Sequence, residues 1–323
     1  MTGFPNLKRI AVLYGGDSPE RDVSLSSGAS VCKGLEEAGF DVEPVERTTA
    51  GEFIKAVTNS AADVFFVALH GGWGEDGRLQ SVLELMGRAY TGSGPGGCAL
   101  AMDKTASKAV FTKSGVPTPQ VVTLKMDSDF SAKGVSMRLE KLVQKWGKAV
   151  VKPCSCGSTV GITIVDSPET LPGAIEEASR LDSTILVEQY IPGKEITVTV
   201  WQEGSSIRCL PAIEIVPKKG FYTYEAKYTP GRTEYLCPAP LAETVAKRVQ
   251  KVSAQAHRCL GCGVYSRVDL RLSDKGAPYV LEVNTAPGMT ATSLVPKSAR
   301  AEGWEFPELL RRISENSLSA DRK

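Results

Sequence analysis

Short apolar runs alternate with amphipathic stretches along the first hundred residues. Residues 8–14 (KRIAVLY) have the pattern of a buried strand, and a helical stretch follows and ends at Gly39. A second apolar run, from Asp63 to Leu69, precedes a helical stretch from Arg78 to Met86. Strands that alternate with helices indicate a mostly parallel sheet. The N-terminal part is therefore predicted to be a βαβ-type α/β unit.

The pattern changes after the turn at residues 115–119. The middle segment combines two helical stretches with strand-like runs at 149–152, 162–165 and 185–187. From Glu188 onward strands dominate until a predicted helix from Leu241 to Arg258, after which a hairpin and a helical tail follow. The fold class is thus α/β with α+β elements, and the predicted domains are 1–103, 104–187 and 188–323.

Composition narrows the class of protein. The longest apolar runs, such as Val64 to Leu69, are far shorter than the roughly 18–20 residues of a membrane span. Lys and Arg number 38 against 37 Asp and Glu, so no global field attracts nucleic acid or an anionic membrane. The N-terminal residues lack the pattern of a signal peptide, which predicts a cytoplasmic protein. Its eight cysteines are expected to be thiols, including the isolated pair Cys259 and Cys262.

The most informative segment is a predicted hairpin that joins residues 267–272 to residues 279–284. Alternation places Val268, Leu270, Leu272, Leu281 and Val283 on one face and Arg267, Asp269, Glu282 and Asn284 on the other. A turn centred between Lys275 and Gly276 sets Asp269 opposite Glu282, where two carboxylates repel unless a cation lies between them. Carboxylate and amide oxygens suit magnesium. The alternative is the solvated polar face of an ordinary hairpin.

Three loops could also carry chemistry. Lys152 leads into a small-residue loop (150–161, VVKPCSCGSTVG) that could hold phosphate, although an ordinary turn with an exposed lysine is an alternative. The aromatic and charged segment 220–231 could close over a ligand and deliver Lys227, or be a plain surface loop. The turn 284–290 could present backbone N–H groups to a carboxylate or oxyanion, or merely connect two elements.

Two other nucleotide-binding motifs are disfavoured. The Walker A pattern is absent from the whole chain. Residues 92–97 (GSGPGG) match G-x-G-x-x-G, but the proline removes a backbone donor and the motif is not in the first βα turn. A P-loop nucleotidase and a dinucleotide enzyme are therefore both poor interpretations.

In combination, these segments resemble the D-alanine–D-alanine ligase family of the ATP-grasp superfamily from about residue 9 to about residue 310. The likeness is carried, in order, by YGGDSPERDVSLSSG (14–28), ALHGGWGEDG (68–77), YTGSG (90–94), MDK (102–104), VVKP with GSTVG (150–161), VEQYIPGKEITV (187–198), FYTYEAKY (221–228), CPAPL (237–241) and RVDL through LEVNTAPGMT and SLVPK (267–297). Several long motifs in the right order are far more specific than any one of them.

The resemblance implies three domains: an N-terminal substrate-binding α/β domain, a central ATP-grasp domain and a C-terminal catalytic ATP-grasp domain, with ATP held between the last two. By this likeness, the residues that contact phosphates are Lys104, Lys152 and Lys227. The residues that hold adenine and ribose are Glu188, Gln189, Ile191 and Glu195. The ligands of two magnesium ions, for which manganese could substitute, are Asp269, Glu282 and Asn284.

The resemblance also implies roles toward the amino acids. Glu20 would orient the ammonium of the first D-alanine and form a hydrogen-bonded set with Ser158 and Tyr228. His70 would lie near that substrate, and Arg267 and the Gly288 N–H would steady the developing charge. Ser293 with Leu294 would receive the carboxylate of the second D-alanine. The reaction would pass through an acyl phosphate to the dipeptide used in peptidoglycan synthesis, and the enzyme would be a homodimer.

The chain departs from the family pattern at three positions. Thr223 stands where the family usually has Asp, and Cys154 and Cys156 replace commoner polar residues. Nearby Lys152 would favour the thiolate form of these cysteines unless both thiols are buried.

The nearest rival function is that of a ligase that joins D-alanine to D-lactate or D-serine. Tyr228 argues against it because lactate-using members replace this tyrosine. A nucleotide-binding protein without catalysis and a dehydrogenase built on residues 92–97 are rivals from other classes.

Overall fold

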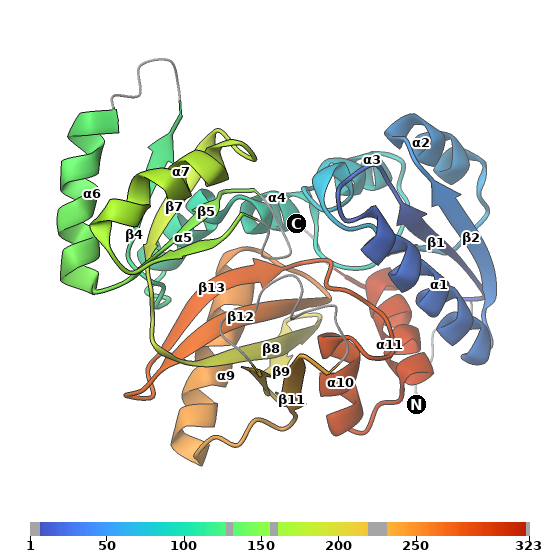
Figure 1. The fold of residues 1–323 in the computed structure, drawn as a ribbon. Helices are drawn as coiled ribbons and strands as arrows, with labels where there is room; N and C mark the ends of the chain where they lie inside the picture. The colour runs from blue at the N-terminus through green and yellow to red at the C-terminus, as the bar shows by residue number, and fades with distance from the viewer. Residues whose placement is uncertain (1–6, 127–131, 156–160, 219–230, 321–323) are drawn as a thin grey trace.

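The computed structural model describes residues 7–126, 132–155, 161–218 and 231–320. Three sheets divide this part of the chain, and Figure 1 shows the N-terminal elements in blue to cyan, the central ones in green to yellow-green and the C-terminal ones in yellow to red. Ser158, Lys227, Tyr228, Cys156 and Thr223, which the sequence singled out, lie outside the described residues.

The N-terminal sheet has the order β2-β1-β3 and is parallel, as predicted. Its strands are β1 (Arg9–Gly15), β2 (Asp41–Arg47) and β3 (Val64–Val67), and its helices are α1 (Arg21–Glu37), α2 (Ala50–Asn59), α3 (Arg78–Leu85) and α4 (Pro95–Met102), with a 3-10 turn η1 (Gly72–Gly74) before α3. A Cβ at Gly28 would lie 2.1 Å from Tyr14 Cγ, so glycine lets α1 pack directly on β1. Helix α1 ends as expected, since Gly39 follows with φ 88°.

The central sheet is antiparallel, with the order β4-β7-β5-β6. It consists of β4 (Val121–Lys125), β5 (Ala149–Pro153), β6 (Thr163–Val165) and β7 (Thr184–Gln189), and α6 (Ala132–Trp146), η2 (Pro168–Thr170) and α7 (Leu171–Ser179) accompany it. Helix α5 (Lys104–Lys113) precedes it, with the Asp103 side chain capping its N-terminus. Since β7 continues to Gln189, this sheet passes the proposed boundary at 187, and the domain boundaries remain a prediction.

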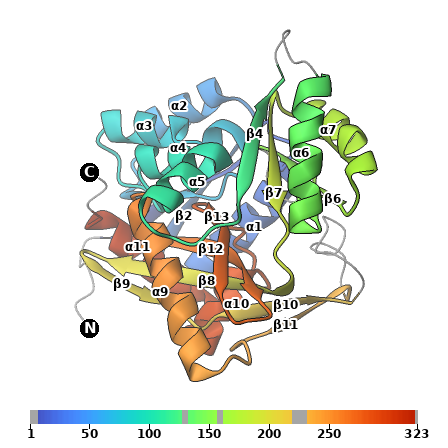
Figure 2. The ribbon, with the colours of Figure 1, turned by 90° about the vertical axis from the view of Figure 1, so that its left-hand side faces the viewer.

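The C-terminal sheet is antiparallel and has β8 (Gly193–Glu203) at its centre. Its order is β11-β10-β8-β12-β13, with β9 paired to β8; the bounds are β9 (Ser206–Cys209), β10 (Ile213–Pro217), β11 (Thr233–Leu236), β12 (Tyr265–Ser273) and β13 (Pro278–Asn284). Figure 2 shows α9 (Glu243–Cys259) lying against this sheet. The chain ends in α10 (Leu294–Ala301) and α11 (Phe306–Leu318).

One apolar core joins the two ends of the chain. Val31 and Leu35 of α1 belong to the same buried cluster as Leu309, Leu310 and Ile313 of α11. The central sheet has a separate core under α6 and α7. The N-terminal and C-terminal parts therefore share an interior, whereas the central part packs around its own.

Candidate active site

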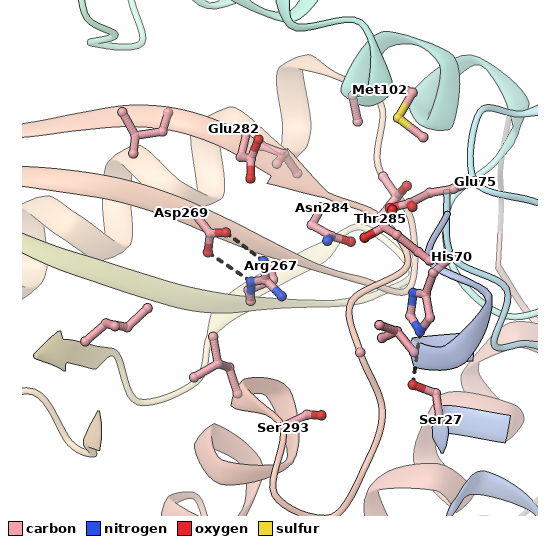
Figure 3. Close-up of a pocket in the computed structure, with 18 of the residues that line it drawn as sticks. Ser27, His70, Glu75, Met102, Arg267, Asp269, Glu282, Asn284, Thr285 and Ser293 are labelled. Atoms are coloured by element: carbon pink, nitrogen blue, oxygen red, sulfur yellow. Dashed lines mark hydrogen bonds and ion pairs between the residues drawn. The ribbon is translucent and has the colours of Figure 1, made fainter. Parts of the chain in front are cut away.

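A cavity of about 560 Å³ lies where the three parts meet. It is lined by twelve of the residues that the sequence singled out: Glu20, His70, Lys104, Lys152, Glu195, Arg267, Asp269, Glu282, Asn284, Gly288, Ser293 and Leu294. Figure 3 shows His70 and Ser27 approaching it from the N-terminal part, and Asp269, Glu282 and Asn284 from the hairpin. The described structure thus brings together side chains that lie up to 274 residues apart in the chain.

The β12–β13 hairpin supplies the acidic wall of this cavity. Its register sets Asp269 opposite Glu282 and Arg267 opposite Asn284, as predicted. One prediction was wrong: Leu281 does not share the core face. A β-bulge lies next to the Asp269–Glu282 pair. The next residue of β12, Leu270, pairs with Val280, so Leu281 is the extra residue on β13. Val280 is consequently buried in the core, and Leu281 lines the cavity.

Cations neutralise the facing carboxylates. Arg267 Nε and Nη2 donate to the two oxygens of Asp269 over 2.9 and 2.7 Å (Figure 3). Lys104 Nζ lies 3.3 Å from Glu282 Oε2. Thr197 Oγ1 also donates to Asp269 Oδ1 over 2.6 Å. These contacts fix the carboxylates at the cavity wall, which contradicts the alternative of a solvated hairpin face.

The donor set fits magnesium better than a softer metal. It offers two carboxylates and the Asn284 amide, and no sulfur or imidazole ligand. Within the described ranges, no cluster of three or more His, Cys, Asp and Glu side chains could hold an ion by itself. Magnesium commonly completes such a sparse set with water and substrate phosphate oxygens. The hairpin could therefore hold magnesium together with a nucleotide.

Lys152 at the end of β5 is buried, not exposed as the alternative interpretation of its loop required. Only 5% of its surface is accessible, and its Nζ lies 3.2 Å from Glu188 Oε2. Lys108 Nζ approaches the same oxygen to 2.5 Å. Burial opposes ionisation of Glu188, but the two lysines outweigh it and hold its pKa below the ordinary value. Sequence reasoning missed Lys108, although its place one helical turn after Lys104 puts both on one face of α5.

Of the residues predicted on the adenine side, Glu195 is the one that lines the described cavity. Glu188, Gln189 and Ile191 belong to or follow β7 and are not among the cavity-lining residues described. The Ile191 carbonyl accepts from Arg271 Nε over 3.0 Å, and Arg271 Nη1 lies 3.5 Å from Glu195 Oε2. Arg271 therefore ties the segment after β7 to Glu195 on the cavity wall.

His70 is buried and neutral. Burial lowers its pKa to about 4, and its Nε2 lies 3.0 Å from Ser27 Oγ. Because the Met289 N–H donates to the same Oγ over 3.2 Å, the Ser27 hydroxyl is free to donate to Nε2, which leaves the other ring nitrogen to donate to the Ala286 carbonyl. Ser27, which sequence reasoning missed, thus joins His70 to the loop that carries Gly288.

Glu75 is a second acidic residue that sequence reasoning missed. It lines the cavity and accepts from the Gly71 N–H over 2.8 Å. Burial and the nearby charge of Glu20 raise its pKa to about 7. The motif HGGWGED contains this glutamate, but the sequence gives no sign that it lies near Glu20 at the cavity.

Ser293 and Leu294 stand at the N-terminus of α10, on the cavity side. The Ser293 hydroxyl accepts from the Thr290 N–H over 3.0 Å and lies 2.8 Å from Thr290 Oγ1. An exposed turn of N–H and hydroxyl groups at a helix start suits a carboxylate. The turn 284–290 is thus more than a connection, because its end forms a wall of the site.

Of the two alternatives for Cys154, the structure supports a buried thiol over a reactive thiolate. The residue is buried, and this burial raises the pKa of its thiol. Its Sγ lies 3.2 Å from Asp103 Oδ1, which favours the protonated thiol further. Cys259 and Cys262 are free thiols at the end of α9, as expected.

No helix within the described residues combines the length and apolar character needed to cross a bilayer.

The chain is similar to proteins of known function in both sequence and fold. The model of the D-ala D-ala ligase C-terminus matches residues 110–315, and that of the N-terminus matches residues 9–62 and 55–93. A D-alanine–D-alanine ligase of Syntrophotalea carbinolica is 43% identical over 306 residues, 95% of each chain. The same enzyme of Bacillus anthracis, solved in complex with ATP, is 34% identical, with a TM-score of 0.82 over 97% of this chain and 98% of that one.

A relative with a different second substrate also shares the fold. The VanG D-Ala:D-Ser ligase of Enterococcus faecalis is 29% identical, with a TM-score of 0.78 over 95% of this chain and 98% of that one. The central and C-terminal sheets are both antiparallel, and the cavity contains buried Lys104 and Lys152 together with the carboxylates of the β12–β13 hairpin. This arrangement and the structural neighbours define an ATP-grasp enzyme. Within that class, the chain belongs to the D-alanine–D-alanine ligase family, the family of ATP-dependent ligases that its two matching models describe.

Proposed function

We propose that this ligase uses ATP to join two molecules of D-alanine into D-alanyl-D-alanine for peptidoglycan synthesis. The observation that carries the proposal is the opposition of Asp269 and Glu282 on the cavity wall, within reach of Lys104 and in the same cavity as Lys152. This arrangement suits transfer of a phosphoryl group, in which cations must offset negative charge on several oxygens.

In the first step, a carboxylate oxygen of the first D-alanine attacks the terminal phosphorus of ATP, the bond to ADP breaks, and an acyl phosphate forms. Lys104 and Lys152 hold phosphate oxygens. Asp269, Glu282 and Asn284 would ligate magnesium, of which two ions are proposed and for which manganese could substitute; bound metal supplies Lewis-acid charge. Glu20 accepts hydrogen bonds from the ammonium of this substrate, beside the neutral His70.

In the second step, the neutral amine of the second D-alanine attacks the acyl carbon to form a C–N bond. The C–O bond to phosphate then breaks, and inorganic phosphate leaves the tetrahedral intermediate with the proton that the nitrogen loses. Arg267 and the Gly288 N–H steady the oxyanion, and Ser293 and Leu294 receive the carboxylate of the incoming amino acid. The proposal extends by family resemblance to Ser158, Lys227 and Tyr228, to Gln189, Ile191 and Glu195 on the nucleotide, and to a cytoplasmic homodimer of three domains.

The test is release of phosphate from ATP in magnesium buffer, with product analysis by chromatography. D-Alanine should stimulate release and yield dipeptide, and L-alanine should not. A mixture of D-alanine with D-serine or D-lactate should still yield mainly D-alanyl-D-alanine. Folded protein without D-alanine-stimulated release would contradict the proposal, and a predominance of the mixed product would assign the chain to the rival specificity.

A further inference from the structure

Lys108 is a buried lysine of α5 that the proposed reaction does not use. It is 2% exposed and is not among the cavity-lining residues described, in contrast to Lys104 one turn earlier and Lys152 on β5. Its Nζ lies 2.5 Å from Glu188 Oε2 and donates to Thr118 Oγ1 over 2.9 Å. A lysine so deep in the protein carries a desolvation cost that needs a compensating partner.

Its second contact fixes it in place. The Thr118 hydroxyl donates its proton to the Val280 carbonyl over 2.8 Å, so that it must accept from Lys108. Val280 precedes the bulged residue Leu281 on β13. Lys108 is therefore held between the central sheet, through Glu188, and the C-terminal sheet, through Thr118, and it stays behind the cavity wall.

Glu188 pairs with two lysines, of which one, Lys152, lines the cavity and the other, Lys108, is held away from it. Lys152 contacts Glu188 at 3.2 Å and lines the cavity, whereas Lys108 contacts Glu188 and does not. The charged groups that face one another here are Lys104, Lys108, Lys152, Glu188 and Glu282, with three positive and two negative charges. The surplus positive charge suits the arrival of a phosphate anion.

We propose that Lys108 is a positioning residue that keeps Glu188 paired when Lys152 turns to the phosphates of ATP. A buried carboxylate that loses its only cation takes up a proton. With Lys108 present, Lys152 is released without that change, and Glu188 stays an ionised, paired carboxylate. This inference rests on the proposed function of the site in binding ATP.

The test measures binding of a non-hydrolysable ATP analogue with magnesium by calorimetry at pH 7. Titrations in two buffers of different ionisation enthalpy count the protons taken up on binding. Lys108→Met should weaken binding by about tenfold to hundredfold and increase proton uptake by up to one proton per site. The matched control, Lys113→Met, removes an exposed lysine from the same helix and should match the wild type in both measurements.

A second variant assigns the proton. In Lys108→Met/Glu188→Gln the group that would be protonated is missing, so the extra uptake should disappear. A folded Lys108→Met protein whose proton count equals that of the wild type would overturn the proposal. If Lys108→Met does not fold, infrared difference spectra of the wild type, assigned with Glu188→Gln, decide the question, because Glu188 must stay ionised when the analogue is bound.

The same preparation separates this inference from the proposed function. Wild-type protein that neither binds the analogue nor makes dipeptide would reject the proposed function. Wild-type protein that makes dipeptide, beside a Lys108→Met variant with unchanged proton uptake, would reject only the role of Lys108.

Discussion

Glu282 joins the two sides of the proposed phosphoryl-transfer site, since it faces Asp269 across the hairpin and lies 3.3 Å from Lys104. Substitution Glu282→Gln keeps the shape of the side chain and removes one charge. We expect dipeptide synthesis to fall by about a hundredfold or more, because one charge-stabilising contact at a catalytic centre contributes about 3 kcal/mol. Steady-state phosphate release checks this, and Glu177→Gln on the exposed face of α7 is the control. Near-normal turnover of Glu282→Gln would show that the metal lies elsewhere.

Ser27 gives a second prediction for a single residue. Ser27→Ala leaves the Met289 N–H and His70 Nε2 without the hydroxyl that joins them. An unpaired buried group costs about 1–3 kcal/mol, so kcat/KM for D-alanine should fall by about tenfold to a hundredfold, with little change in KM for ATP. Ser30→Ala, one turn further along α1, should leave both parameters unchanged. An equal loss in both variants would indicate general damage to the helix.

Individual residues mark where sequence reasoning succeeded and where it stopped. The opposition of Asp269 and Glu282 followed from alternation and the turn, since both are local properties of one hairpin. The contacts of Lys108 with Glu188 and of Ser27 with His70, and the proximity of Glu75 to Glu20, join segments far apart in the chain. No spacing in the sequence predicted them. The burial of Cys154 likewise depends on Asp103 and Thr105, about 50 residues earlier.

At the scale of elements, the bulge in β13 illustrates the same limit. Strict alternation placed Leu281 in the core, but one inserted residue shifts every side chain before it by one position. Leu281, the inserted residue, lies at the cavity beside Glu282, where its side chain offers an apolar surface to a planar ligand such as adenine. A period of two in the sequence carries no sign of such an insertion.

His257, where α9 packs on the C-terminal sheet, predicts a pH dependence of the free energy of unfolding. His257 is buried, its Nδ1 lies 2.7 Å from Ser266 Oγ and its Nε2 lies 3.0 Å from Gln202 Oε1. Burial lowers its pKa from 6.5 to about 4, so between these pH values the unfolded chain binds a proton that the native protein does not. Stability is therefore fully present above about pH 6.5 and is lost as the pH falls toward about 4, with a slope near 1.4 kcal/mol per pH unit for each such histidine.

Urea unfolding between pH 5 and pH 7 measures this dependence. His70 titrates in the same sense, so the two histidines should contribute about equally. His257→Gln should remove about half of the histidine contribution to the slope, whatever its effect on the free energy of unfolding at pH 7. A slope identical to that of the wild type would mean that His257 is not neutral in the native state.

At the scale of the whole molecule, the site needs the central and C-terminal parts together with metal and nucleotide. Removal of magnesium with EDTA should abolish dipeptide synthesis and reduce the rise in Tm that an ATP analogue produces, since weaker binding of a ligand to the native protein stabilises it less. Excess magnesium should restore both, and manganese should substitute. The contrary result is full activity in metal-free buffer, which would leave the two facing carboxylates without the proposed role.

The core that joins α1 to α11 has a consequence for how the chain can be divided. The two matching family models separate near residues 93–110, yet Val31 and Leu35 pack against Leu310 and Ile313 at the other end of the chain. A fragment ending at residue 103 would expose this apolar face to water and would tend to self-associate. We therefore expect the first and last segments to unfold as one cooperative unit and the central sheet, which has its own interior, to open without them.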